Sequence, residues 1–165
     1  VRVEVQDDHI EARTLSDAVF QAWIDKEGIA HLHIKTIRQN GLRDPYFDRH
    51  RASELARRAI SHFDQIEPVK GIKFDWGRPT TAEVGDRSDN YSAYLNARNI
   101  LVDSEDYETA KKQALLQTWT FRNVALPLGF SEVNTVVEKG DVDAPTTITG
   151  IAYRLRTPDS ANQAA

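Results

Sequence analysis

The chain has 165 residues, a length typical of one domain and sufficient to bury a substantial core. Its 40% hydrophobic and 28% charged content excludes a disordered or fibrous chain, and no apolar run is long enough for a membrane span or signal peptide. The net charge of −4 gives no overall attraction to nucleic acid, and the absence of cysteine excludes disulfides, thiolate zinc sites and cysteine nucleophiles.

Charge is distributed unevenly along the chain. Residues 35–58 carry seven basic side chains against three acids, whereas residues 101–145 carry eight acids against four basic side chains. Solvated helix and loop faces account for such runs, and a basic binding surface at 35–58 is the functional alternative.

The first half of the chain predicts strands followed by a helix. Alternating apolar and polar residues indicate half-buried strands, two of which form an antiparallel hairpin. An amphipathic pattern predicts a helix over 52–65, with Ser53 as its N-cap. The strands expected here span 1–5, 18–25, 29–37 and 71–76.

The second half predicts two helices and a closing pair of strands. After a turn-rich loop, a short helix is capped by Ser88 or Asp89 and extends to about Asn96. A longer helix begins after Ser104 and extends to about Leu126, because Pro127 forbids its continuation. The closing strands are expected at 130–138 and 146–156.

Together these elements predict an α+β fold. We expect a mainly antiparallel sheet of about six strands packed by three helices, in the order β-β-β-α-β-α-α-β-β. Residues 1–157 form a single domain in this interpretation, and 158–165 form a flexible tail.

No stretch of the sequence matches a high-specificity catalytic motif. A glycine-rich phosphate loop, a Gly-x-Ser-x-Gly elbow and a His-Glu-x-x-His pattern are all missing. His9, His50 and His62 have no partner at a recognised ligand spacing, so we predict no metal site. The cofactor stays unassigned.

Three short groups of residues remain as site candidates. Asp75 and Trp76 end a strand, where binding sites are often built. Three polar residues follow at the start of the next helix, where capping is the structural alternative to substrate binding. Within "TWTFR", a threonine lies one turn before an arginine, which indicates either an ion pair or an anion site. The catalytic candidates are Asp89, Asn90, Thr118, Thr120 and Arg122, and the substrate-binding candidates are Asp75, Trp76, Ser88, Arg49 and Arg51.

Asp89 is the candidate acid, base or orienting group among these residues. Asn90, Thr118, Thr120 and Arg122 would bind and polarise the substrate.

Residues 66–156 resemble C-terminal domains of bacterial polymorphic toxins, including those behind Rhs-type repeat shells. The matching motifs are "FDW", "SDN", "TWT" and "LGFSEV"; the family often has glycine and a basic residue after the second threonine, where this chain has Phe121 and Arg122. The resemblance implies an effector that is released from a larger carrier protein and neutralised by a cognate immunity protein. It implies secretion or delivery into a target cell, with action in the cytoplasm on a macromolecule or small molecule. The absence of methionine agrees with such release, and we expect the chain to be a processed or shortened part of a larger protein.

The order of elements is also similar to that of GNAT-type acetyltransferases. In that family a glycine-rich turn holds the coenzyme A pyrophosphate on backbone amides before the central helix. This chain has "YFDRHRAS" at that place, so Arg49 and Arg51 supply charge without the glycine turn, and it has an insertion between Asn90 and Gly129. Three functions therefore stay open: a toxin-type enzyme, a GNAT-like acyltransferase, and a non-catalytic module that binds through residues 35–58 and aromatic side chains.

Overall fold

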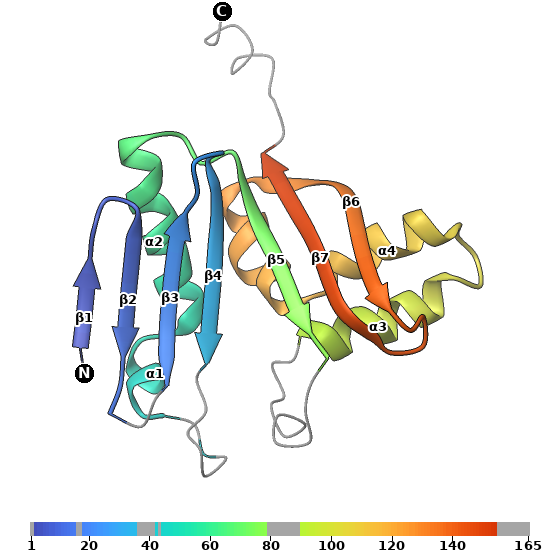
Figure 1. Cartoon of the computed structure of the whole chain (residues 1–165), viewed down its shortest axis with the longest axis horizontal. Coiled ribbons are helices and arrows are strands. Elements are labelled where there is room, and N and C mark those ends of the chain that lie inside the picture. The colour runs from blue at the N-terminus through green and yellow to red at the C-terminus, as the bar shows by residue number, and fades with distance from the viewer. Residues whose placement is uncertain (1, 16–17, 36–41, 43, 79–89, 155–165) are drawn as a thin grey trace, which may run out of the picture.

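The computed structural model of the chain describes residues 2–15, 18–35, 42, 44–78 and 90–154. Within these residues, one seven-stranded sheet has helices packed against one of its faces (Figure 1). The strands are β1 (Arg2–Val5), β2 (His9–Arg13), β3 (Val19–Ile24), β4 (Ile29–Lys35), β5 (Gly71–Gly77), β6 (Phe130–Gly140) and β7 (Pro145–Arg154). The helices are α1 (Tyr46–Arg49), α2 (Ala52–Ile66), α3 (Asn90–Leu101) and α4 (Tyr107–Leu115), then a π-helix η1 (Phe121–Ala125) and a 3₁₀-helix η2 (Leu126–Leu128). The predicted α+β class is confirmed.

The sheet has the order β1-β2-β3-β4-β5-β7-β6, and one of its neighbouring pairs is parallel. That pair joins β4 to β5, with α2 crossing between them as parallel pairing requires. The pairing extends only from Ile29 opposite Gly71 to His31 opposite Lys73, although β4 continues to Lys35. Figure 1 shows the two strands diverging toward their C-terminal ends.

The core lies between the sheet and the helices. On β3, β4 and β5, alternate residues such as Phe20, Ala30 and Phe74 are buried on the helix side. The matching stripe of α2 is Ala52, Ala56, Ala59, Ile60 and Phe63, which are all buried. Burying each large side chain contributes about 1.5–3 kcal/mol, so this one stripe holds the crossover against the sheet.

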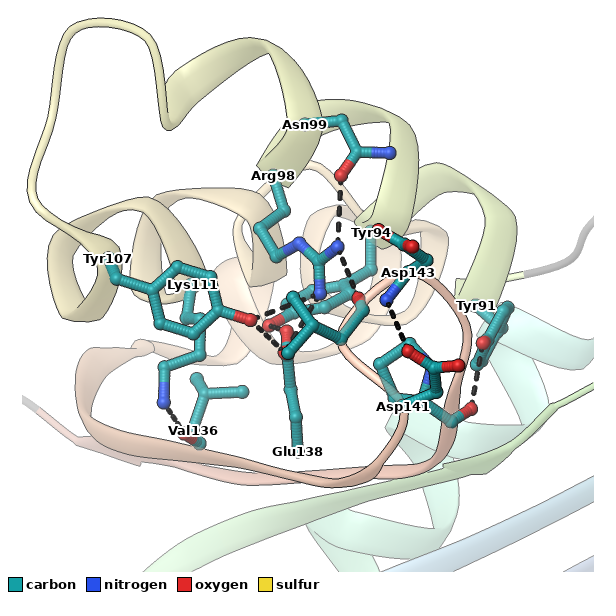
Figure 2. Close-up of polar contacts among 12 residues, drawn as sticks. Tyr91, Tyr94, Arg98, Asn99, Tyr107, Lys111, Val136, Glu138, Asp141 and Asp143 are labelled. Atoms are coloured by element: carbon teal, nitrogen blue, oxygen red, sulfur yellow. Dashed lines mark hydrogen bonds and ion pairs between the residues drawn. The ribbon is translucent and has the colours of Figure 1, made fainter.

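A buried ionic network attaches α3 and α4 to β6 (Figure 2). Arg98 is 3% exposed, and its Nη1 donates to Glu138 Oε1 at 2.8 Å. Tyr94 Oη donates to the second carboxylate oxygen of Glu138 at 2.5 Å, and Tyr107 Oη also donates to this carboxylate. Arg98 further donates to the carbonyl of Val142 in the β6–β7 turn at 2.8 Å. The network thus joins two helices and the hairpin at one carboxylate.

Burial and hydrogen bonding set the protonation states in this network. Burial alone would raise the pKa of Glu138, but the hydrogen bonds from Tyr107, Tyr94 and Arg98 hold it below the ordinary value of 4.5. Burial and the contact with Glu138 raise the pKa of Tyr107 to about 12 and raise that of Tyr94 further. Glu138 is therefore a carboxylate at neutral pH, and both tyrosines remain donors.

Several elements differ from the sequence-based predictions. β2 was not predicted, because its five residues include only two apolar residues facing the helices, Ile10 and Ala12. The sheet therefore has seven described strands rather than about six. The expected N-caps Ser53 and Ser104 are replaced by Arg51 and Asp106.

The long helix expected from Ser104 to Leu126 is interrupted. α4 ends at Leu115, and the chain continues into the π-helix η1. At the interruption, the hydroxyl of Thr118 donates to the carbonyl of Leu115 at 2.7 Å and accepts from Phe121 N at 3.4 Å. A threonine hydroxyl that satisfies local backbone groups in this way competes with continuous helix. The predicted tail at 158–165 lies outside the described residues, as do the caps Ser88 and Asp89.

We predict that Glu138→Gln lowers the free energy of unfolding at neutral pH by about 3 kcal/mol, because it leaves the buried Arg98 guanidinium without its anion. Because the pKa of Glu138 is lowered in the folded state, its stabilisation is present above the unfolded pKa and is lost as pH falls through the folded value. Urea unfolding should therefore show a difference from the unsubstituted chain that shrinks below about pH 4.5. Glu132→Gln, at an exposed position of the same strand, is the control, and an equal loss at both positions would contradict the prediction.

Candidate functional site

A cavity of about 420 Å³ lies where β4 and β5 diverge. Its walls come from the two strands, the start of α2, the first residue of α3 and the segment around η1. We call it the β4–β5 cavity. Its lining residues are Leu32, His33, Ile34, Arg51, Ala52, Ser53, Lys73, Phe74, Asp75, Trp76, Asn90, Trp119, Thr120 and Asn123.

The residues that line the cavity come from both faces of the sheet. Phe74 and Trp76 belong to the helix side, where their rings lie 5.6 Å apart. Lys73 and Asp75 alternate with them and belong to the opposite face. Residues of both faces can reach one cavity only where neighbouring strands separate. β4 and β5 separate after their three paired residues.

The N-terminal end of α2 forms one wall. Ala52 and Ser53 line the cavity, and the first intrahelical bond that involves Arg51 runs from Leu55 N to the Arg51 carbonyl. The amides before Leu55 therefore have no acceptor within the helix. Together with the helix dipole, such amides favour a negative group beside them, and the guanidinium of Arg51 adds a full positive charge to this wall.

A second wall is the segment that enters and forms the π-helix. Trp119, Thr120 and Asn123 line the cavity from this segment. The carbonyl of Asn123 accepts from Arg57 Nη1 of α2 at 2.7 Å, and its side-chain amide donates to the carbonyl of Trp119 at 2.9 Å. π-helical turns are rare and occur frequently at functional sites, and this one is held to α2 by a hydrogen bond.

Five of the predicted site residues meet at this cavity: Asp75, Trp76, Asn90, Thr120 and Arg51. They come from β5, α3, the entry to η1 and the start of α2, which are far apart in sequence. Asn90 has a defined structural role, because its Oδ1 accepts from Thr120 N at 3.0 Å and so joins α3 to the π-helical wall.

The structure places two other candidates elsewhere. Thr118 is fully buried and bonded to its own backbone segment, whereas Arg122 is exposed and donates to Gln117. Neither lines the cavity. Arg122 N donates to the Thr118 carbonyl at 3.1 Å, so the two residues lie one turn apart as predicted. The Thr118 hydroxyl bonds to backbone groups and the Arg122 guanidinium bonds to Gln117, so the two side chains do not form a joint site. Ser88 and Asp89 lie outside the described residues, as does the side chain of Arg49, the last residue of α1.

The sequence-based candidates did not include several polar or aromatic lining residues, among them His33, Lys73, Trp119 and Asn123. Lys73 precedes the "FDW" motif, and Trp119 is the central residue of "TWT". Both residues are next to predicted site residues, so the same two motifs could have identified them. His33 and Asn123 had no local signal, because only the divergence of two strands and the π-helix bring them to the cavity.

The described residues contain no group of three or more histidine, aspartate or glutamate side chains arranged to hold a metal ion. One acid–imidazole pair lies on the open face of the sheet, where His31 Nε2 is 2.8 Å from Asp25 Oδ2 and the imidazole stacks on Trp23. Burial would raise the pKa of Asp25, but His31 and the amides of Ile29 and Glu27 lower it. This pair does not line the cavity.

We predict that Asn90→Ala lowers the free energy of unfolding by about 1–2 kcal/mol, because Thr120 N then loses its acceptor at a buried position. Chemical denaturation measures the loss. Asn96→Ala on the exposed side of the same helix is the matched control, and it should be neutral or slightly stabilising because alanine favours helix. Equal stability of the two variants would remove the proposed role of Asn90 in joining α3 to η1.

None of the helices in the described part of the chain is long and apolar enough to cross a membrane. Comparisons of the chain with protein-family models, with curated proteins and with solved structures find no match.

Proposed function

We propose that the chain is a toxin-type effector domain that acts at the β4–β5 cavity on an anionic ligand with a planar ring, such as a nucleotide. We infer the class of ligand from the residues that line the cavity. Its lining includes the amide end of a fifteen-residue helix, two strongly basic residues and two tryptophans. The effector role is supported by the resemblance of residues 66–156 to polymorphic toxin domains.

The charges of the described lining favour an anion. Arg51 and Lys73 are the strongly basic groups, Asp75 is the acid, and the start of α2 adds the partial positive charge of its dipole. Phosphate and carboxylate groups bind well at such helix ends, because backbone amides and the dipole act together. An arginine adds bidentate hydrogen bonding to the same groups.

The aromatic residues favour a flat ring as the second part of the ligand. Trp76 and Trp119 both line the cavity and both are half-buried, so part of each indole remains available for contact. Stacking of a base on an aromatic side chain contributes about 1–3 kcal/mol and tolerates different bases. An anionic group at α2 and a ring against an indole together describe a nucleotide or a nucleotide-containing cofactor.

Acyl transfer from coenzyme A is the reaction that best fits this ligand class, and it is our enzymatic alternative. Coenzyme A carries a nucleotide and a pyrophosphate, and the resemblance to GNAT-type enzymes implies a pyrophosphate site at the start of the central helix. In this chain that helix is α2, whose N-terminal end forms a cavity wall. The attacking amine or hydroxyl of an acceptor must lose a proton, and His33 and Asp75 are lining groups able to take it.

A non-catalytic module that binds through the basic region 35–58 is less well supported. Of its basic residues on α2, Arg57 donates to the carbonyl of Asn123 and Arg58 pairs with Glu54. These contacts give both side chains a structural role. Arg51 from the same region lines the cavity, so the proposed ligand uses part of this basic region.

We predict that acetyl-CoA or ATP raises the melting temperature of the chain, with a stabilisation of about 2.7 kcal/mol at a hundredfold excess over Kd. Arg51→Glu should weaken binding at least tenfold by placing an anion at the helix end, and Trp76→Ala should weaken it by loss of stacking. Calorimetric titration gives the affinities, and inorganic pyrophosphate tests the anionic part alone.

Arg58→Glu is the control for this binding experiment, because Arg58 is exposed on the same helix and does not line the cavity. Binding of acetyl-CoA without ATP would favour acyl transfer, and the reverse would favour a different nucleotide reaction. Absence of binding by both ligands, or unchanged binding by Arg51→Glu, contradicts the proposed site.

We also predict that expression of the chain in a bacterial cytoplasm arrests growth, and that Asp89→Ala relieves the arrest if this carboxylate serves as the acid, base or orienting group. Colony counts after induction measure the effect at matched levels of soluble protein. Asp103→Ala, at an exposed position after α3, should remain toxic. Normal growth with the unsubstituted chain counts against the effector role while leaving the ligand proposal to the binding experiment.

A further inference from the structure

We propose that the outer edge of β1 is the docking surface for a second copy of this chain. The two β1 strands would pair antiparallel about a twofold axis at Val3 and join the two sheets into one. β1 is the first strand in the sheet order, so its outer edge has no neighbouring strand among the described residues. The inference is independent of the proposed function.

The backbone of β1 has the correct groups directed outward. Gln6 N donates to the His9 carbonyl at 2.7 Å across the β1–β2 turn, so the backbone groups of Gln6 face β2. Because alternate residues of an antiparallel strand bond to the same neighbour, Arg2 and Glu4 also face β2. The N–H and C=O groups of Val3 therefore face away from the sheet, and two copies centred on Val3 exchange two backbone hydrogen bonds.

The charges of β1 are self-complementary in this register. With Val3 opposite Val3, Arg2 of each copy lies opposite Glu4 of the other, twice by symmetry. Both positions are non-hydrogen-bonded pairs, in which opposing side chains approach most closely. In the single chain Arg2 pairs with Glu4 of its own strand, and the Arg2 side chain remains 79% exposed, so it is accessible to a second carboxylate.

The same charges exclude the neighbouring register. A shift by two residues would place Val3 opposite Val5 of the second copy and Glu4 opposite Glu4. Like charges directly opposite each other are destabilising, so this arrangement is disfavoured. A shift by one residue would bring side chains of opposite sheet faces together.

Apolar side chains of β1 gain burial from the pairing. Val3 is 56% exposed and Val5 is 60% exposed, whereas Ala12, which lies opposite Val3 on β2, is 3% exposed. The apolar face of the sheet thus continues onto an edge strand that the helices do not cover. Pairing brings the two Val3 side chains side by side on this face.

The test is the mass of the full chain in solution over a range of concentrations, measured by sedimentation. The unsubstituted chain is expected to form a dimer whose fraction rises with concentration. Arg2→Glu and Glu4→Arg should each shift the chain to monomer, because each places like charges opposite one another in the proposed register. A mixture of these two variants should restore a one-to-one dimer, since a β1 strand with two acidic side chains then pairs with one that has two basic side chains.

Two further variants separate the proposed edge from other surfaces. Lys139→Glu reverses an exposed charge on β6, at the other edge of the sheet, and should leave the dimer unchanged. Val3→Pro removes the outward N–H while keeping the edge strand, and should give a folded monomer by circular dichroism. A chain that stays monomeric at all concentrations, or a dimer that survives Arg2→Glu, overturns the proposal. Failure of the two folded charge variants to associate with each other overturns it as well.

Discussion

The short parallel contact between β4 and β5 sets the arrangement of the whole sheet and of the helix that crosses it. This contact connects an antiparallel group of four strands, β1 to β4, with an antiparallel group of three strands, β5, β7 and β6. Parallel pairing requires a crossover, and α2 supplies it on the helix side of the sheet. The N-terminal end of α2 is thereby brought to the edge where both strands end. The same contact stops after three residue pairs, so the strands separate there and leave the cavity.

The other walls of the cavity depend on how firmly α3 and the π-helix are held. The network of Arg98, Glu138, Tyr94 and Tyr107 attaches α3 to the β6–β7 hairpin. At its other end, α3 contacts the π-helical wall through Asn90. Desolvation offsets much of the charge attraction in a buried ion pair, so the pair adds little net stability relative to apolar packing. In this chain it holds one arrangement of two helices and a hairpin, and that arrangement fixes the position of Asn90.

Much of the fold was predictable because its elements follow from local patterns. The apolar stripe of α2, the alternation in β3 and β4 and the closing strands β6 and β7 are visible as periodicity, since one face of each element must be buried. β2 could not be predicted from periodicity, because only two of its residues are apolar and face the helices. The π-helix could not be predicted from periodicity either. The break before it coincides with hydrogen bonds from the Thr118 hydroxyl to backbone groups three residues away in each direction, and these bonds leave no periodic pattern in the sequence. The two threonines of "TWT" have unfavourable helix propensity, and this was the available signal in the sequence.

The candidate site was predictable only in part. Side-chain chemistry and local patterns predicted which residues suit a binding site and which elements contain them. Asp75, Trp76 and Thr120 were predicted on those grounds. Which of these residues share a cavity depends on long-range packing, because the ladder between β4 and β5 and the crossover by α2 bring together segments far apart in the chain. His33 and Lys73 line the cavity because β4 and β5 diverge. The hydroxyl of Thr118 instead bonds to the backbone carbonyl of Leu115. Periodicity indicates which face of one element is buried. A cavity depends on where neighbouring elements do not pack against each other, and this does not follow from the pattern of any single element.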